Sequence, residues 1–411
     1  MRLDTLRLVS FRAHADSRFT FAPKVNLLYG ANGAGKTNVV EAVHYLCLSK
    51  SFLASTDQHV LRRESPFFEV EGRFVGDETA DRLVRLVFVP GQGKKAFVNR
   101  APLDRLADLV GVAPVVALSP ADHALTADGP DERRRFIDNT LSQARPAYLA
   151  DLFRYKRALK QRNALLLQAR RSRQDPAALD AWDEELVTLG SRLIARRARF
   201  LAEFARYLAE AYRRLDGVGD EPTLTYDTVV EVGDEVDEAT IAEQFRERLH
   251  RVARRERELG RTRIGPHRDE VVFKLGGFEV RPYASQGQHR LFGVALQLAR
   301  FFYLHEQTEK LPLLLLDDVF GTLDARRAAI VLELLRSDAV GQSIVTAARR
   351  DPFAGLVPFD APEHAAIEIE AGRVVEPEPE GAAGAGDEGG GEVATLAVAE
   401  PRGTDGGSTG L

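Results

Sequence analysis

Cysteine is nearly absent from this 411-residue sequence, and long apolar runs are missing altogether. The single cysteine, Cys47, excludes an internal disulfide and any zinc site built from several cysteines. No apolar run approaches the roughly 20 residues that a membrane helix needs, and the first residues alternate like a strand and do not resemble a signal peptide. We therefore expect a soluble, cytoplasmic protein in a reducing setting, without a membrane partner.

The sequence also lacks any helix-turn-helix, zinc-finger or RNA-recognition string, so nucleic-acid binding is expected to be independent of base sequence. The net charge of −5 conceals an uneven distribution: residues 376–411 hold eight acids and one base, which leaves +2 on the other 375 residues. Residues 145–173 hold nine Arg or Lys against one acid, Asp151. Such a run attracts polyphosphate, although a merely solvated basic helix gives the same pattern.

A glycine-rich loop stands between an apolar, strand-like run and an amphipathic, helix-like run within residues 25–49. It has the form G-x-x-x-x-G-K-T, in which glycines let backbone N–H groups surround phosphates. Lys36 is expected to reach the β- and γ-phosphates, and the Thr37 hydroxyl to bind Mg²⁺. The residues expected to bind ATP are Gly30, Ala31, Asn32, Gly33, Ala34, Gly35, Lys36, Thr37 and Asn38.

Two further motifs follow near the other end of the chain. Four leucines precede Asp317 and Asp318, which places two carboxylates at the end of a buried strand. Asp317 is expected to complete the magnesium shell, whereas Asp318 points to the opposite side of the strand and polarises the attacking water. The other motif opens a helix, whose N-terminus favours an anion. It consists of Ser285, Gln286, Gly287 and Gln288.

Hydrophobic periodicity divides the chain into three regions. Short alternating runs before about residue 120 predict an antiparallel sheet beside the phosphate-binding strand, and runs from 270 to 375 predict a return to parallel strands and helices. Three-four spacing between about 130 and 263 predicts helices throughout. The expected inward faces are Leu149, Leu152, Lys156, Leu159, Asn163 and Leu166; Trp182, Leu186, Leu189, Leu193, Phe200, Phe204, Tyr207 and Ala211; and Ile241, Phe245, Leu249, Val252 and Leu259.

The order of these motifs resembles that of ABC-type ATPase heads, and more closely that of the RecF family in their SMC-like branch. The matching stretches are residues 26–52, 119–138, 262–270, 283–290 and 313–324. The resemblance implies that Ser285–Gln288 from one subunit closes over ATP held by another, and that Asp318 and Lys36 are catalytic. It also implies a D-loop ending in Asp324, with Thr322 where the family has Glu, and Thr346 in place of a switch histidine.

The same resemblance implies a weak, Mg²⁺-dependent ATPase that forms an ATP-dependent homodimer. Its expected partners are DNA, at junctions of single strand and duplex, together with RecR and RecO, and RecA is a functional link. The expected roles are DNA replication, repair, recombination and the SOS response. An SMC-like chromosome-organising ATPase and a transporter nucleotide-binding subunit are the alternatives, although the missing coiled-coil arm and switch histidine oppose them.

The expected fold is α/β: an ABC-type P-loop ATPase head, with a parallel core sheet and an antiparallel sheet, and an inserted compact helical lobe. The head comprises residues 1–140 and 264–375, the lobe 141–263, and a disordered acidic tail 376–411. His267 is expected to be a satisfied loop histidine or, alternatively, a sensor. Arg133, Arg134 and Arg135 are expected to be a solvated helix start, DNA contacts or part of an inter-lobe surface, in that order.

Overall fold

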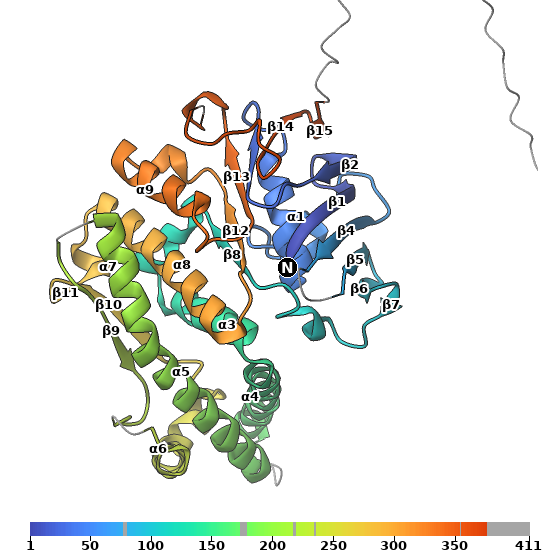
Figure 1. Ribbon diagram of the computed structural model, residues 1–411. Coiled ribbons are helices and arrows are strands. Elements are labelled where there is room, and N and C mark those ends of the chain that lie inside the picture. The colour runs from blue at the N-terminus through green and yellow to red at the C-terminus, as the bar shows by residue number, and fades with distance from the viewer. Residues whose placement is uncertain (77–79, 173–178, 217–218, 234–235, 354, 376–411) are drawn as a thin grey trace, which may run out of the picture. The chain divides into compact units, whose positions relative to one another are not determined.

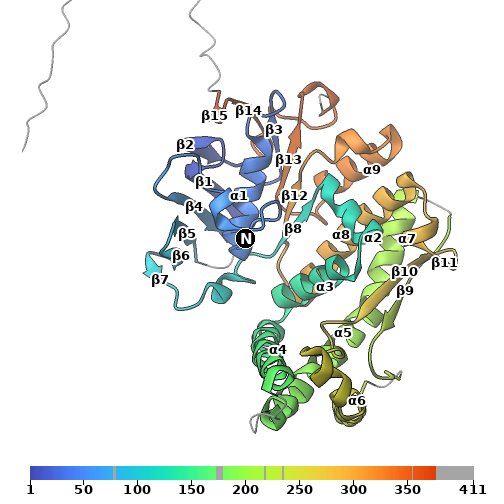
Figure 2. The same ribbon diagram turned by 180° about the vertical axis from the view of Figure 1, so that it is seen from behind.

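The computed structural model describes residues 1–76, 80–172, 179–216, 219–233, 236–353 and 355–375, and Figures 1 and 2 show them from two sides. Contacts join Met1–Val375 into one unit. The acidic tail expected at residues 376–411 lies outside the described residues. Among the helices of the described ranges, none is long and apolar enough to cross a membrane.

The central sheet carries the phosphate-binding strand at its middle. Its strand order is β15-β14-β3-β13-β12-β8, and all neighbours are parallel except the terminal pair β14 and β15. The strands are β3 (Val25–Tyr29), β8 (Val115–Leu118), β12 (Leu313–Leu316), β13 (Ser343–Ala347), β14 (Ala365–Glu370) and β15 (Arg373–Val374). Every side chain of Leu313–Leu316 is buried, as expected of a continuous apolar run covered on both faces.

An antiparallel sheet accompanies it, in the order β2-β1-β4-β5-β6-β7, as the alternation predicts. Its strands are β1 (Arg2–Phe11), β2 (His14–Thr20), β4 (Phe68–Val75), β5 (Arg82–Val89), β6 (Gly93–Val98) and β7 (Ala101–Pro102). Helix α1 (Lys36–Leu48) lies between the two sheets (Figure 1). Val39, Val43 and Leu46 of α1 share one buried core with residues of both sheets, so packing on two sides fixes the helix that begins at the phosphate loop.

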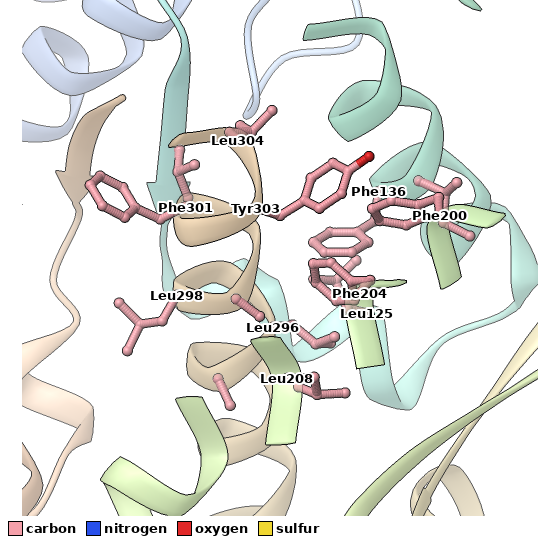
Figure 3. Close-up of a cluster of buried hydrophobic side chains, with 14 of the residues drawn as sticks. Leu125, Phe136, Phe200, Phe204, Leu208, Leu296, Leu298, Phe301, Tyr303 and Leu304 are labelled. Atoms are coloured by element: carbon pink, nitrogen blue, oxygen red, sulfur yellow. The ribbon is translucent and has the colours of Figure 1, made fainter. Parts of the chain in front are cut away.

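Helices cover the other side of the central sheet and extend beyond it. They are α2 (His123–Ala127), α3 (Pro130–Ala144), α4 (Pro146–Ser172), α5 (Leu179–Asp216), α6 (Glu238–Leu259), α7 (Val280–Tyr283), α8 (Gln286–Thr308) and α9 (Ala325–Arg336). Figure 3 shows where α3, α5 and α8 meet. The Tyr303 ring of α8 lies 4.9 Å from that of Phe200 and 6.1 Å from that of Phe204, both on α5. Aromatic packing thus anchors α8 along α5.

A third, small sheet corrects the prediction that residues 130–263 are only helical. Strand β9 (Pro222–Asp227) pairs antiparallel with β10 (Glu270–Leu275), which in turn pairs with β11 (Phe278–Glu279). The return to a parallel sheet expected from residue 270 is therefore wrong for β10. A strand as short as β9 is masked by the long helical periodicity on both sides of it.

The inward face predicted for α4 is also wrong in part. Lys156 is exposed, whereas Tyr155, Ala158 and Arg162 are buried. Arg162 can lie inside because its guanidinium pairs with Glu256, 2.7 Å away on α6, so apolar periodicity misses its position. The faces predicted for α5 and α6 are confirmed at their central positions. The division into a head and a lobe remains a prediction.

Candidate nucleotide-binding site

The loop between β3 and α1 has a backbone that only glycine adopts with ease. Gly30, Gly33 and Gly35 have φ of 143°, 82° and 109°. A Cβ atom on Gly30 would lie 2.2 Å from the carbonyl oxygen of Ile369, so a larger residue does not fit. Since α1 begins at Lys36, the positive end of its helix dipole lies at this loop, which favours an anion there.

The Lys36 ammonium group contacts the backbone at the start of this loop. Its Nζ donates to the carbonyl oxygens of Gly30 at 2.8 Å and Ala31 at 2.9 Å. Partial burial lowers the pKa of Lys36, while the charges of Asp318 and Asp317 oppose that shift. The charges of both acids therefore act on the amine, although they are about 280 residues away in the sequence.

Thr37 and Asp317 are in direct contact. The Thr37 hydroxyl donates to Oδ1 of Asp317 at 2.8 Å, and the Thr346 hydroxyl donates to the same oxygen at 2.9 Å. Burial raises the pKa of Asp317, and the two hydroxyl donors partly offset this effect. A hydroxyl and a carboxylate side by side are hard oxygen ligands of the kind Mg²⁺ prefers. The described residues contain no cluster of three or more His, Cys, Asp or Glu side chains suited to a metal.

Asp318 occupies a different position from the one predicted. Strand β12 ends at Leu316, so Asp318 does not lie on the opposite side of a strand. It follows in a left-handed turn with φ of 53°, its side chain is exposed, and its N–H donates to the Thr346 hydroxyl at 2.9 Å. The Thr346 hydroxyl therefore contacts both acidic residues at once, at the position where the resemblance predicts a residue in place of a switch histidine.

The helix start at Ser285 is exposed. Ser285 and Gln288 form a capping box, in which the serine hydroxyl accepts from the Gln288 N–H and the glutamine oxygen accepts from the Ser285 N–H. Gln286 and Gly287 are also exposed and stand beside a cavity of about 360 Å³ that Gln286, Arg290 and Thr322 help to line. Within the described part of the chain, no hydrogen bond joins this group to Lys36, Thr37 or Asp317.

Asp324 caps α9 and is exposed. Its carboxylate accepts from the Arg327 N–H at 2.9 Å, and this bond lowers the pKa of Asp324. The Thr322 hydroxyl donates to the carbonyl oxygen of Val319 at 2.8 Å. Both residues are thus tied locally.

Two of the residues left open by the sequence are buried contacts between elements. Arg133 is 4% exposed and pairs with Glu270 on β10 at 2.8 Å, so the solvated helix start ranked first is wrong for this arginine. His267 Nδ1 lies 2.7 Å from the Tyr155 hydroxyl, and burial lowers the pKa of His267 to about 4. His267 therefore forms a buried hydrogen bond with Tyr155, which agrees with the satisfied histidine expected first.

His14 is a neighbour of the phosphate loop that the sequence analysis missed. Its Nε2 lies 3.1 Å from the Gly35 carbonyl oxygen, and its Nδ1 lies 2.9 Å from that of Gly372. A single histidine outside any motif offers no signal from which this contact could be predicted.

Comparison with known proteins agrees with this geometry. The family model described as RecF/RecN/SMC N terminal domain matches residues 2–358. A DNA replication and repair protein RecF from Salinibacter ruber is 52% identical over 389 residues, covering 93% of this chain and 94% of that protein. The chain belongs to the RecF family. A RecF from Chloroherpeton thalassium is 41% identical and covers 86% of the chain and 96% of its own length.

Solved structures give the same answer for the fold. A recombination mediator protein RecF with ATP, of the RecFOR pathway, is 27% identical with a TM-score of 0.84, covering 91% of this chain and 96% of that one. An Smc head domain at 15% identity has a TM-score of 0.51 and agrees in fold alone. The predicted family and the predicted α/β head of the ABC type are therefore confirmed, and the reading as a transporter subunit is dropped.

Proposed function

We propose that this protein is an ATP-dependent DNA-binding repair protein that uses slow ATP hydrolysis as a switch. The convergence of Thr37, Asp317 and Lys36 carries the proposal, because the loop and the acid are far apart in the sequence and meet by hydrogen bonding. The RecF relatives, which are named for DNA replication and repair and include a structure with ATP, support it.

In this proposal the loop from Gly30 to Asn38 holds the triphosphate through its backbone N–H groups. The Lys36 amine exchanges its two carbonyl partners for phosphate oxygens, which bear more negative charge. Thr37 and Asp317 would hold Mg²⁺, which would supply positive charge to the triphosphate. Binding the metal also relieves the burial cost of the Asp317 carboxylate, which otherwise raises its pKa.

Asp318 and Thr346 are proposed to orient the attacking water. Thr346 fixes the Asp318 N–H, so the exposed carboxylate is held beside the loop by its backbone. Aspartate has a shorter reach than the glutamate of transporter heads, and this fits a slow turnover. The protein would then remain in its ATP-bound state for a long time between hydrolysis events.

Ser285–Gln288 is proposed to close the site of a second copy. The group is exposed and sits at a helix start, so a partner's γ-phosphate can reach its hydroxyl and N–H groups. Two-fold symmetry would bring each such helix to the other copy's loop, with Asp324 and Thr322 at the contact. Bound ATP would then hold the two subunits of the homodimer together, and its hydrolysis would let the subunits separate.

DNA is proposed to lie against the outward face of α4. Arg157, Lys160 and Arg171 are exposed there and recur at helical spacing. The ion pairs of α4 in the described ranges involve Asp151, Arg154 and Arg162, and none of them involves these three residues. Free cations along one helix face suit the phosphates of a duplex, so binding should ignore base sequence and weaken with salt.

The partner set is proposed from the family. The related structures belong to a RecFOR pathway and are described as recombination mediators. We infer that this chain acts with RecO and RecR at junctions of single-stranded and duplex DNA in the cytoplasm, and thereby promotes RecA loading.

The test is DNA affinity measured against salt with ATP, with ADP and without nucleotide. We expect ATP to raise affinity in the natural protein and to have no effect in Lys36→Ala. Arg157→Glu with Lys160→Glu should weaken DNA binding and lower the salt slope by about 2, one for each lost phosphate contact. The control is Arg206→Glu with Arg213→Glu, which carries the same charge change on exposed residues of α5 that already pair with acids. Equal losses in both pairs, or no effect of ATP, would refute the proposal.

A further inference from the structure

The imidazole of His14 is buried behind the phosphate loop, with 0% of the residue exposed. It stands at the start of β2, and its edge contacts the Phe19 ring, with the centroids 5.7 Å apart. Its Nε2 is 3.1 Å from the Gly35 carbonyl oxygen. On the other side, Nδ1 is 2.9 Å from the Gly372 carbonyl oxygen and 3.0 Å from the Ser17 hydroxyl.

The turn between β14 and β15 reaches the same place from the far end of the chain. Ala371 and Gly372 have φ of 47° and 77°, and the Gly372 N–H donates to the Ala34 carbonyl oxygen at 2.8 Å. A Cβ atom on Gly372 would lie 2.5 Å from the Ala13 carbonyl oxygen, so the close approach requires glycine. The loop is thus held from behind by two segments.

These contacts act on two successive peptide units. In a trans peptide the C=O and the following N–H point in opposite directions. Holding the Ala34 carbonyl toward Gly372 therefore turns the Gly35 N–H to the other side. The Gly35 carbonyl oxygen accepts from the Asn38 N–H at 3.0 Å and the Val39 N–H at 3.3 Å, and it lies 3.1 Å from His14 Nε2. This direction of the carbonyl does the same for the Lys36 N–H. Both N–H groups then face the concave side of the loop.

We propose that His14 is a positioning residue for nucleotide binding: its ring adds a buried side-chain contact to the Gly35 carbonyl that α1 already holds, and so keeps the Lys36 N–H aimed at the phosphates before they arrive. The inference rests on the nucleotide-binding function proposed above. A neutral imidazole has one N–H, and we assign it to Nε2. The Ser17 hydroxyl donates to the Gly372 carbonyl oxygen at 2.7 Å, so this carbonyl is paired without the ring. Nδ1 lies 2.9 Å from the same oxygen, so a proton on Nδ1 would be donated to Gly372 instead, and His14→Asn would then bind ATP better than His14→Gln and overturn the proposal. Burial lowers the pKa of His14, which agrees with a neutral ring.

Substitution of His14 by Gln or by Asn distinguishes a hydrogen-bonding role from simple packing. Gln at position 14 places an N–H near the position of Nε2, whereas Asn places one near Nδ1. We expect His14→Gln to keep ATP affinity within about threefold of the natural protein, and His14→Asn and His14→Leu to weaken it about fivefold to twentyfold, the effect of one buried hydrogen bond. The rate at saturating ATP should change much less than the KM, because the chemistry residues are untouched.

Amide hydrogen exchange without nucleotide gives a second readout. Exchange at residues 33–37 should be faster in His14→Leu and His14→Asn and close to natural in His14→Gln. Thr140→Val is the control, since it removes a buried hydroxyl that donates to the Phe136 carbonyl oxygen on α3, away from the loop. It should leave both readouts unchanged.

The outcomes separate the two proposals. If the natural protein binds ATP and Lys36→Ala does not, nucleotide binding stands, and equal behaviour of the Gln, Asn and Leu variants overturns the role of His14. If the natural protein binds no ATP, the proposed function fails, and the exchange pattern alone decides whether His14 orders the loop.

Discussion

Thr346→Val removes a hydroxyl that makes two contacts in the centre of the site while keeping the side chain's shape. The Thr346 hydroxyl donates to Asp317 at 2.9 Å and accepts from the Asp318 N–H at 2.9 Å. Losing a hydrogen bond to a buried carboxylate and leaving a backbone N–H unpaired should lower the free energy of unfolding by about 2–4 kcal/mol. The pKa of Asp317, already raised by burial, should rise further because one of its two hydroxyl donors is gone.

Two measurements follow from this substitution. Denaturant unfolding gives the loss of stability, and ATP hydrolysis under saturating nucleotide should fall about tenfold or more, because both acids lose their orientation. Thr346→Ser keeps the hydroxyl and should restore most of the rate, at a stability cost of about 1 kcal/mol for the lost methyl group. Hydrolysis within twofold of natural in the Val variant, or no recovery in the Ser variant, would refute the role of Thr346.

Three other predictions concern single positions or one segment. Asp318→Asn should leave ATP bound and trap the closed dimer on a sizing column, and unchanged hydrolysis would reassign the water-orienting role. Deleting residues 377–411 should leave DNA affinity unchanged or slightly higher, since the segment's acids compete for basic surface, and a large loss would contradict this reading. Burial raises the pKa of Asp122 to about 6, so the folded state binds the proton more tightly than the unfolded one, and stability from this group is full below about pH 4 and lost as pH rises through 6. Asp122→Asn gives up an acceptor for the Ser119 N–H or the Gln297 amide at every pH, but it should remove the loss of about 2–3 kcal/mol in the free energy of unfolding between pH 4 and pH 7, and an unchanged pH dependence in the variant would count against it.

The parts of the site that the sequence predicts are those encoded by local patterns. The loop glycines, Lys36 and Thr37 follow from a spacing, and Asp317 follows from its place after four leucines. The fold class follows similarly, because alternating runs and continuous apolar runs mark antiparallel and covered parallel strands.

What the sequence does not predict depends on contacts between distant segments. His14 and Gly372 meet across more than 350 residues, and neither lies in a motif. Asp318 lies outside the strand because β12 ends two residues before it. The apolar residues of the sequence do not determine where the strand ends. Arg162 is buried because Glu256 on α6 and Asp183 on α5 pair with its guanidinium, which reverses the face expected from hydrophobic spacing.

Mixing two inactive variants tests the account most directly. Lys36→Ala lacks its own loop cation, and Ser285→Arg blocks the helix start offered to a partner, so a dimer of one of each keeps a single intact composite site. We expect neither variant alone to hydrolyse ATP above background, and an equimolar mixture to recover about a quarter of the natural rate, since half the dimers are mixed and each has one working site. A mixture no more active than either folded variant would contradict a site shared between two copies.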